Sequence, residues 1–255
     1  MTPIRIPVGP EAERRDIAVL ARPGGSPGLF WLGGYRSDMM GSKALAIDAL
    51  GARENLAITR FDYSGHGVSG GDFLDGTITR WLEEALAVFA TTTGPQVVIG
   101  SSMGGWLALL MNRALRLAGS DRVKALILIA PAVDMTSELM EKEFSPAERA
   151  AMATLGHVDQ PSQYSADPYP ITRALIEDGR AHLLLADRGI DTGCPVTILQ
   201  GGADPDVPRD HALRLVQHLL TDPVTFTLIP DGDHRLSRPE DLRILEKAIL
   251  RAVTE

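Results

Sequence analysis

Cysteine is almost missing from this sequence: Cys194 is the only one in 255 residues. A single thiol allows no internal disulfide and no zinc site built from several cysteines. The chain also lacks any run of about 18 apolar residues, the length that crosses a bilayer, and residues 1–16 hold no apolar core of signal-peptide length. We therefore expect no membrane span and a reducing compartment, with the cytoplasm as the predicted location.

An excess of basic residues is missing as well. The chain has 25 Lys and Arg against 33 Asp and Glu, a formal net charge of −8, and no cationic cluster that can follow a phosphate backbone. Nucleic acid is therefore not an expected partner. The hydrophobic share of 44% and the charged share of 23% are typical of a globular protein. We expect one domain over residues 1–255, and its oligomeric state cannot be read from the sequence.

Short apolar segments alternate with longer amphipathic ones along the chain. The expected strands are residues 29–34, 56–63, 95–100, 124–132, 195–202 and 224–230. The expected helices are residues 42–53, 77–92, 106–117, 208–220 and 238–253. Strands that are apolar on both faces and separated by helices indicate an α/β fold, in which helices flank a mostly parallel central sheet.

The alternation stops between residues 134 and 191, where no strand pattern appears. Inside this segment Ser145, Pro146 and Glu148 form a capping box with proline at the first helical position, which predicts a helix start. The same box at Ser237 and Glu240 predicts the start of the last helix. We expect residues 134–191 to be a helical lid, inserted over the carboxyl edge of the sheet.

Flexible apolar side chains are frequent in the expected lid. Methionine fits irregular apolar ligands, and therefore several lid residues are candidates to line a substrate-binding pocket for an acyl chain. These candidates are Met135, Met140 and Met152, together with Leu139 and Leu155. The alternative is that the same residues form the lid's own core.

The pattern Gly-x-Ser-x-Gly occurs three times, centred on Ser26, Ser69 and Ser102. Only Ser102, within QVVIGSSMGGWLAL, has an apolar strand before it and a helix directly after it, as a nucleophile elbow requires. Gly100 and Gly104 lack the β-carbons that would collide where strand and helix approach each other. Ser102 is therefore the predicted nucleophile.

A serine nucleophile needs N–H donors for the negative oxygen that forms during acyl transfer. The N–H of Met103, at the start of the helix after Ser102, is the first candidate. The second is the N–H of Tyr35, in the loop after residues 29–34, where Gly34 permits a close approach. Tyr35 and Met103 are thus the predicted oxyanion hole.

The nucleophile also needs a base, and an acid that orients the base. In the chain order Ser, Asp or Glu, His, the histidine that follows a late strand in a loop is His234. His66 precedes Ser102, and we expect it to have a structural role in a turn. Asp204 and Asp206, after residues 195–202, are both candidates for the acid on this reasoning.

With these motifs the sequence resembles the α/β-hydrolase superfamily over nearly its whole length. The stretches that carry the resemblance are RFDYSGHGVSGG, GSSMGGW, LQGGADPDVP and DGDHRL. The superfamily pattern H-G-x-x-D-x-x-V-P overlays Asp204 on the acid and puts Gln200 where a histidine is usual. The resemblance therefore implies an α/β-hydrolase fold and a catalytic triad of Ser102, Asp204 and His234.

A narrower resemblance comes from KALAI, RFDYSG, GSSMGGW and DHR, which are similar to the branch described as palmitoyl-protein thioesterases and acyl-glucuronide esterases. It implies a serine hydrolase that cleaves acyl thioesters or carboxylic esters, including S-palmitoyl groups, on a small molecule or an acyl-protein. Such acyl transfer needs no cofactor and no metal.

Three alternatives to this function remain open. The first is a generic carboxylesterase, and the second is a serine peptidase of the same fold that anchors the amino end of a peptide. Glu138, Glu141 and Glu143 are the candidates for that anchor. The third is a non-catalytic, hydrolase-like binding protein, because a fold does not dictate a function.

Overall fold

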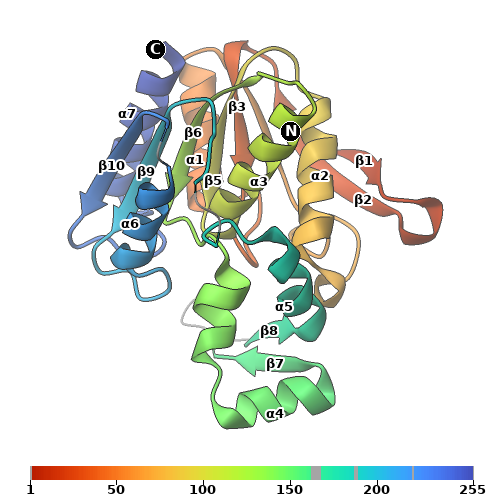
Figure 1. Ribbon diagram of the computed structural model, residues 1–255. Helices are drawn as coiled ribbons and strands as arrows, with labels where there is room; N and C mark the ends of the chain where they lie inside the picture. The colour runs from red at the N-terminus through yellow and green to blue at the C-terminus, as the bar shows by residue number, and fades with distance from the viewer. Residues whose placement is uncertain (1, 162–167, 187–188, 220, 255) are drawn as a thin grey trace.

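An eight-stranded sheet forms the centre of the protein (Figure 1), whose computed structural model describes residues 2–161, 168–186, 189–219 and 221–254. The strands lie in the order β1-β2-β4-β3-β5-β6-β9-β10. They are β1 (Ile4–Val8), β2 (Arg15–Arg22), β3 (Gly25–Leu32), β4 (Leu56–Phe61), β5 (Gln96–Ser101), β6 (Val123–Ile129), β9 (Val196–Gly201) and β10 (Val224–Ile229). The strands from β4 to β10 in this order run parallel, whereas β1 with β2 and β2 with β4 pair antiparallel.

The mostly parallel sheet confirms the predicted fold class, and all six predicted strands are present. Strands β1 and β2 were not predicted. β1 is a largely exposed edge strand that contains Pro7, and its sequence IRIPV therefore lacks the continuous apolar run of the central strands.

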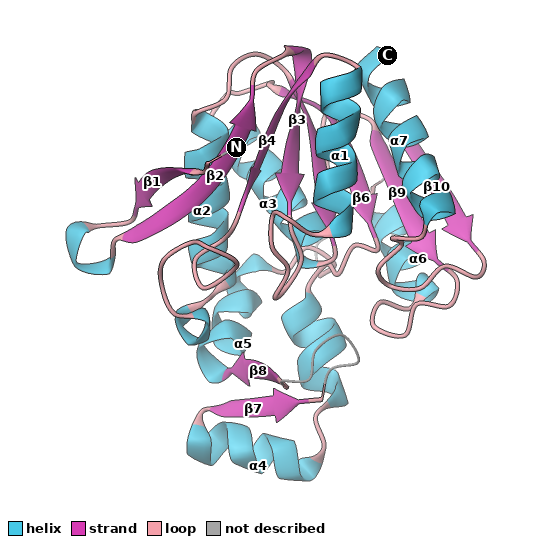
Figure 2. Ribbon diagram, turned by 180° about the vertical axis from the view of Figure 1, so that it is seen from behind, coloured by secondary structure: helices cyan, strands magenta, loops and turns pink. Residues whose placement is uncertain are grey.

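Two layers of helices cover the sheet. They are α1 (Ser42–Arg53), α2 (Ile78–Ala90), α3 (Met103–Leu117), α6 (Arg209–His218) and α7 (Pro239–Thr254). α1 and α7 pack on one face, in front in Figure 2, and α2, α3 and α6 pack on the other. Successive side chains of a strand point to opposite faces of the sheet and so pack in the two cores alternately: Leu29 faces α1, and Phe30 faces the opposite layer.

The five predicted helices are present, with small differences at their ends. α3 begins at Met103, three residues before the predicted start, and the predicted end of α6 at Leu220 lies outside the described residues. Within the described part of the chain, no helix is long and apolar enough to span a membrane.

The chain between β6 and β9 forms an insertion beyond the carboxyl ends of the parallel strands (Figure 1). It contains a π-helical turn (Thr136–Met140), a 3-10 turn (Glu141–Glu143), α4 (Pro146–Leu155), β7 (His157–Gln160), β8 (Tyr169–Thr172), α5 (Arg173–Gly179) and a second 3-10 turn (Arg180–His182). The expected helical character is thus accompanied by a two-stranded antiparallel sheet. Each strand has four residues, too few to show a period-two pattern in the sequence.

A buried carboxylate ties the two ends of the insertion together. Asp134 accepts hydrogen bonds from the N–H groups of Leu184 and Leu185, both at 2.8 Å. Asp134 is fully enclosed, with 2% of its surface exposed. Since a buried carboxylate needs such donors, these two bonds hold the two ends of the insertion together at its base.

The two predicted helix caps had different outcomes. At α4 the box is confirmed, because Ser145 Oγ accepts the Glu148 N–H and the Glu148 carboxylate accepts the Ser145 N–H. At α7 the prediction was wrong: Ser237 Oγ donates to the Arg235 carbonyl, and Asp241 accepts the N–H of Arg238. The helix begins at Pro239, so its third position is Asp241 rather than Glu240.

Candidate active site

Ser102 lies at the sharp turn between β5 and α3. Its backbone has φ 53° and ψ −120°, a conformation that is strained for a residue with a side chain. The other two Gly-x-Ser-x-Gly matches lack this setting: Ser26 lies within β3, and Ser69 Oγ donates to the Asp62 carbonyl in a loop. The strand–turn–helix context predicted for Ser102 is therefore present.

Glycines make this turn possible because backbone atoms fill the space around them. A β-carbon on Gly100 would lie 2.2 Å from the Gly104 carbonyl oxygen, and one on Gly104 would lie 2.2 Å from the Leu32 oxygen. On Gly34 it would lie 3.3 Å from Ser102 Cβ. Strand, helix and the loop after β3 thus approach one another around Ser102 as the sequence predicted.

His234 reaches Ser102 from the loop between β10 and α7. Its Nε2 lies 3.0 Å from Ser102 Oγ, and its Nδ1 lies 2.9 Å from Asp204 Oδ2. A carboxylate only accepts hydrogen bonds, and Nδ1 therefore carries the proton while Nε2 accepts from the serine hydroxyl. The three predicted triad residues, far apart in the sequence, form one hydrogen-bonded chain.

Asp204 is the carboxylate that faces His234, and its own loop holds it. The side chain is fully buried, and Oδ1 accepts the N–H groups of Asp206 and Val207 at 2.9 Å each. Gln200 Nε2 lies 3.3 Å from Asp204 Oδ2 and 2.9 Å from the Val207 carbonyl oxygen. The glutamine that replaces the usual histidine thus braces the acid and its loop.

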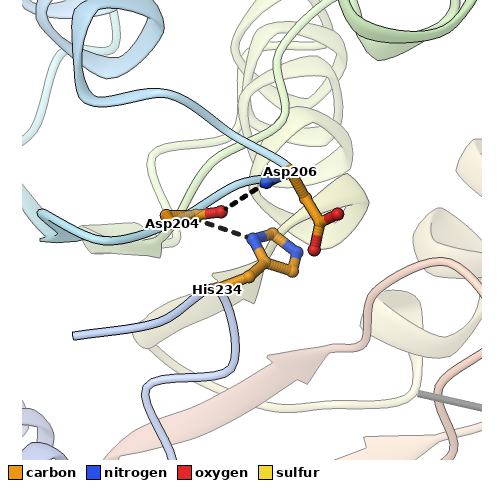
Figure 3. A group of neighbouring side chains, drawn as sticks. All are labelled: Asp204, Asp206 and His234. Atoms are coloured by element: carbon orange, nitrogen blue, oxygen red, sulfur yellow. Dashed lines mark hydrogen bonds and ion pairs between the residues drawn. The ribbon is translucent and has the colours of Figure 1, made fainter. Parts of the chain in front are cut away.

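Asp206 lies beside the same imidazole (Figure 3). A carboxylate oxygen of Asp206, one of Asp204 and a ring nitrogen of His234 all lie within 4.8 Å of one another, which is a set of groups that can bind a metal ion. Here, however, Nδ1 pairs with Asp204, and Asp204 Oδ1 accepts two N–H groups. The atoms that Asp204 and His234 would offer to a metal are therefore already engaged in hydrogen bonds.

The two predicted oxyanion donors border the turn at Ser102. Met103 is the first residue of α3, so its N–H has no partner within the helix. Tyr35 directly follows Gly34, whose close approach places this loop against Ser102. The Tyr35 hydroxyl donates to the Pro170 carbonyl of the insertion at 2.6 Å, which holds the loop from the other side.

A cavity of about 260 Å³ opens beside Ser102 and His234. Its wall comes from the loop after β3, the first turn of α1, the His234 loop and Tyr169 of the insertion. Arg36, Lys43, Tyr169 and Arg235 are among the wall residues that were not predicted from the sequence. Arg36 and Arg235 directly follow the predicted site residues Tyr35 and His234, and this adjacency in the sequence could have indicated them. Nothing in the sequence around Lys43 or Tyr169 indicated that they line the cavity.

The predicted pocket methionines lie elsewhere, and none of them lines this cavity. Met135 is buried in the large core on the α3 side of the sheet. Met152 packs in the insertion's own small core, and Met140 contacts both cores. Met152 and Met140 thus agree with the alternative that these residues form the insertion's own core, whereas Met135 belongs to the core of the sheet.

Two other histidines have structural partners. His66 is buried, its Nδ1 lies 3.0 Å from the Ser64 carbonyl oxygen, and its Nε2 accepts the N–H of Arg36 at 3.1 Å. Burial lowers the pKa of His66 to about 4, so the ring is neutral at pH 7. His211 is also buried, and its Nε2 lies 2.9 Å from the Val133 carbonyl oxygen.

This protein has an α/β-hydrolase fold. The fold is defined by the mostly parallel sheet covered on both faces, the elbow after β5 and the loops that meet at the carboxyl edge. A family model described as the alpha/beta hydrolase family matches residues 18–243, and the chain belongs to this family.

Known proteins similar to this chain include thioesterases and hydrolases. The mouse palmitoyl-protein thioesterase ABHD10, mitochondrial, is 32% identical over 237 residues, which cover 92% of this chain and 77% of that protein. A solved structure of mouse ABHD10 matches with a TM-score of 0.86 and 29% identity, over 98% of both chains. A putative hydrolase from Agrobacterium vitis S4 matches with a TM-score of 0.95 and 51% identity, also over 98% of both chains.

Proposed function

We propose that this protein is a serine hydrolase that cleaves acyl thioesters or carboxylic esters, with Ser102 as the nucleophile. The observation that carries the proposal is the hydrogen-bonded chain from Ser102 Oγ through the His234 ring to the buried Asp204. Similarity to the palmitoyl-protein thioesterases extends the proposed substrates to S-acyl groups on proteins or small molecules.

In the first half of the reaction, His234 Nε2 takes the proton of Ser102 Oγ while that oxygen attacks the acyl carbon. The N–H groups of Tyr35 and Met103 donate to the oxyanion of the tetrahedral intermediate. When this intermediate collapses, the thiol or alcohol leaves with the proton from Nε2. The acyl group remains as an ester on Ser102.

In the second half, a water molecule gives a proton to His234 Nε2 and attacks the acyl carbon of the ester. The carboxylic acid departs, and Ser102 Oγ regains its proton. Throughout both halves Asp204 stabilises the imidazolium that forms and keeps its Nδ1–H directed at the carboxylate. The two N–H groups on Asp204 Oδ1 keep this carboxylate in place.

The peptidase alternative has less support. Glu138 pairs with Arg214 at 2.7 Å, and Glu141 pairs with Arg180 at 2.7 Å. Neither of them, nor Glu143, is among the described residues that line the cavity. The three glutamates therefore offer no anchor for the amino end of a peptide at Ser102.

The experiment compares the wild type with Ser102→Ala on matched thioesters and oxygen esters with acyl chains from butyryl to palmitoyl. We expect kcat to fall by about 10³-fold or more, because the nucleophile is gone. Ser120→Ala is the control, since Ser120 lies at the far end of the sheet, before β6. A cavity of about 260 Å³ is near the low end of ligand pockets, and we expect butyryl substrates to turn over fastest.

Each outcome separates the candidate functions. A preference for thioesters supports the thioesterase, whereas turnover of oxygen esters alone reduces the proposal to a carboxylesterase. Unchanged activity in Ser102→Ala refutes Ser102 as the nucleophile. If the wild type turns over no substrate and a fluorophosphonate does not label Ser102, the protein is a binding protein instead.

A further inference from the structure

Positive charge gathers at the cavity beside Ser102, although the whole chain carries a net charge of −8. Arg36, Lys43 and Arg235 line the wall, and Asp38 is the one carboxylate among the described lining residues. The Asp38 carboxylate accepts the N–H of Met40 at 2.7 Å and so closes its own turn. The cavity is therefore more positive than the protein around it.

Lys43 lies in the first turn of α1, which forms part of the cavity wall. The residue before this helix is Gly41, which has no side chain to accept the N–H groups of the first turn. The positive end of the α1 dipole therefore adds to the charge of the ammonium group at this wall.

The Lys43 ammonium group has donors available for a ligand. It donates one hydrogen bond to the Arg235 carbonyl, its only acceptor among the described residues. An ammonium group has three N–H donors, so two remain. Burial, and then the charge of Arg235, lower the pKa of Lys43 to about 8, while Asp233 and Asp241 act in the opposite direction. Lys43 is thus cationic but partly desolvated at pH 7.

Arg36 provides a second charge whose position is fixed. Its guanidinium carbon lies 5.1 Å from the ring centre of Phe73 and 5.3 Å from that of Tyr169. Its backbone has φ 53° and is held by His66 Nε2. Among the described residues, Arg36 contacts rings and a carbonyl rather than a carboxylate.

We infer that Lys43 is a specificity-determining residue, whose ammonium group binds an anionic group, a carboxylate or a phosphate, on the substrate whose acyl bond lies at Ser102. This inference rests on the proposed function, because it assigns the cavity to the substrate of Ser102. Arg36, which also lines the cavity, supports the same anion, and a neutral substrate gains nothing from either charge.

The test measures kcat/KM for two substrate pairs that differ in charge. The carboxylate pair is mono-4-nitrophenyl glutarate and 4-nitrophenyl pentanoate, and the phosphate pair is butyryl-coenzyme A and S-butyryl-pantetheine. In Lys43→Met, the anionic-to-neutral ratio should fall about tenfold or more for at least one pair, since a hydrogen bond to a charged group is lost. The pair that responds identifies the anion.

Lys247→Met is the matched control, because it removes the same charge from an exposed position on α7 that is not part of the cavity wall. The ratio should equal that of the wild type there. If Lys43→Met also keeps the wild-type ratio for both pairs, the inference is overturned. If Ser102→Ala retains full activity, the proposed function has failed instead, and the two failures are thereby distinguished.

A pH series provides a readout that does not depend on the folding of Lys43→Met. In the wild type, the ratio should fall as pH rises from 7 to 9, because Lys43 loses its proton near pH 8. In Lys43→Arg it should stay level, because arginine remains charged. The other titratable or charged groups on the wall are Arg36, Asp38, His234 and Arg235, and Asp233 and Asp241 act on Lys43 from outside it; all six are present in both proteins. Equal slopes in the two proteins refute the inference.

Discussion

Two carboxylates of one loop, Asp204 and Asp206, lie close to His234, and they differ in burial and in hydrogen bonding. Asp204 accepts the Nδ1–H of His234 and is fully buried, whereas the Asp206 side chain is exposed. The N–H of Asp206 donates to Asp204, so the second aspartate supports the first through its main chain. A side-chain change at Asp206 therefore leaves this support intact.

Asp204→Asn should lower kcat by about 10³-fold or more while the protein stays folded, because an amide can donate to Nδ1 and so favour the wrong imidazole tautomer. Asp206→Asn is the matched control and should cost less than about tenfold, since its N–H still reaches Asp204. Steady-state kinetics on one ester measure the loss of kcat in each variant. Thermal unfolding shows that both variants are folded. Equal losses in the two variants would show that the acid has been assigned to the wrong residue.

The lowered pKa of the buried His66 ring leads to a prediction about stability rather than activity. Its pKa is about 4 in the folded protein and about 6.5 when unfolded, so between these values the unfolded chain binds the extra proton. This term therefore destabilises the fold as pH falls from about 7 to 4.5, by about 2 to 3 kcal/mol.

His66→Gln lacks this titration, and its free energy of unfolding should fall less than that of the wild type between these two pH values. Urea unfolding of both proteins at pH 7 and pH 4.5 measures the difference. The other histidines and the buried carboxylates are present in both proteins and cancel. If the two proteins differ in free energy of unfolding by the same amount at both pH values, His66 becomes protonated in the folded state as it does in the unfolded chain.

At the scale of elements, the candidate site depends on how closely β5, α3 and the loop after β3 approach one another. Gly100 and Gly104 face backbone atoms of neighbouring elements, and a β-carbon there has no flexible side chain to push aside. This explains why the glycine spacing around Ser102 was informative in the sequence. The other Gly-x-Ser-x-Gly stretches have no such helix directly after them.

Gly100→Ala should destabilise the protein by about 3 kcal/mol or more, because its β-carbon would meet the Gly104 carbonyl at 2.2 Å. Gly33→Ala is the control, since the nearest atom to its β-carbon would lie 3.8 Å away, and it should cost less than about 1 kcal/mol. Denaturant unfolding of both variants makes the comparison. A Gly100→Ala protein as stable as the control would show that β5 and α3 are not packed this closely.

On the scale of the whole molecule, the sequence predicted what depends on pattern and missed what depends on tertiary contact. Short apolar segments identified six of the eight strands of the sheet, and the order of Ser102, Asp204 and His234 identified three side chains that meet in space. β7 and β8 are too short to leave a pattern. Nothing in the chain near Tyr169 indicates that it reaches the cavity, because that placement depends on how the whole insertion folds back.

Because Tyr169 belongs to the insertion, it tests whether the insertion takes part in binding substrate. Its ring faces Arg36 and Tyr35 at the cavity wall, while Ser102, His234 and Asp204 all come from the sheet edge. Tyr169→Ala should therefore raise KM several-fold and leave kcat within about twofold, since it removes binding contacts that substrate and transition state share. Tyr169→Phe keeps the ring and should resemble the wild type. If Tyr169→Ala instead lowers kcat with KM unchanged, the insertion acts on the chemical step, and the division between a catalytic sheet edge and a binding insertion is wrong.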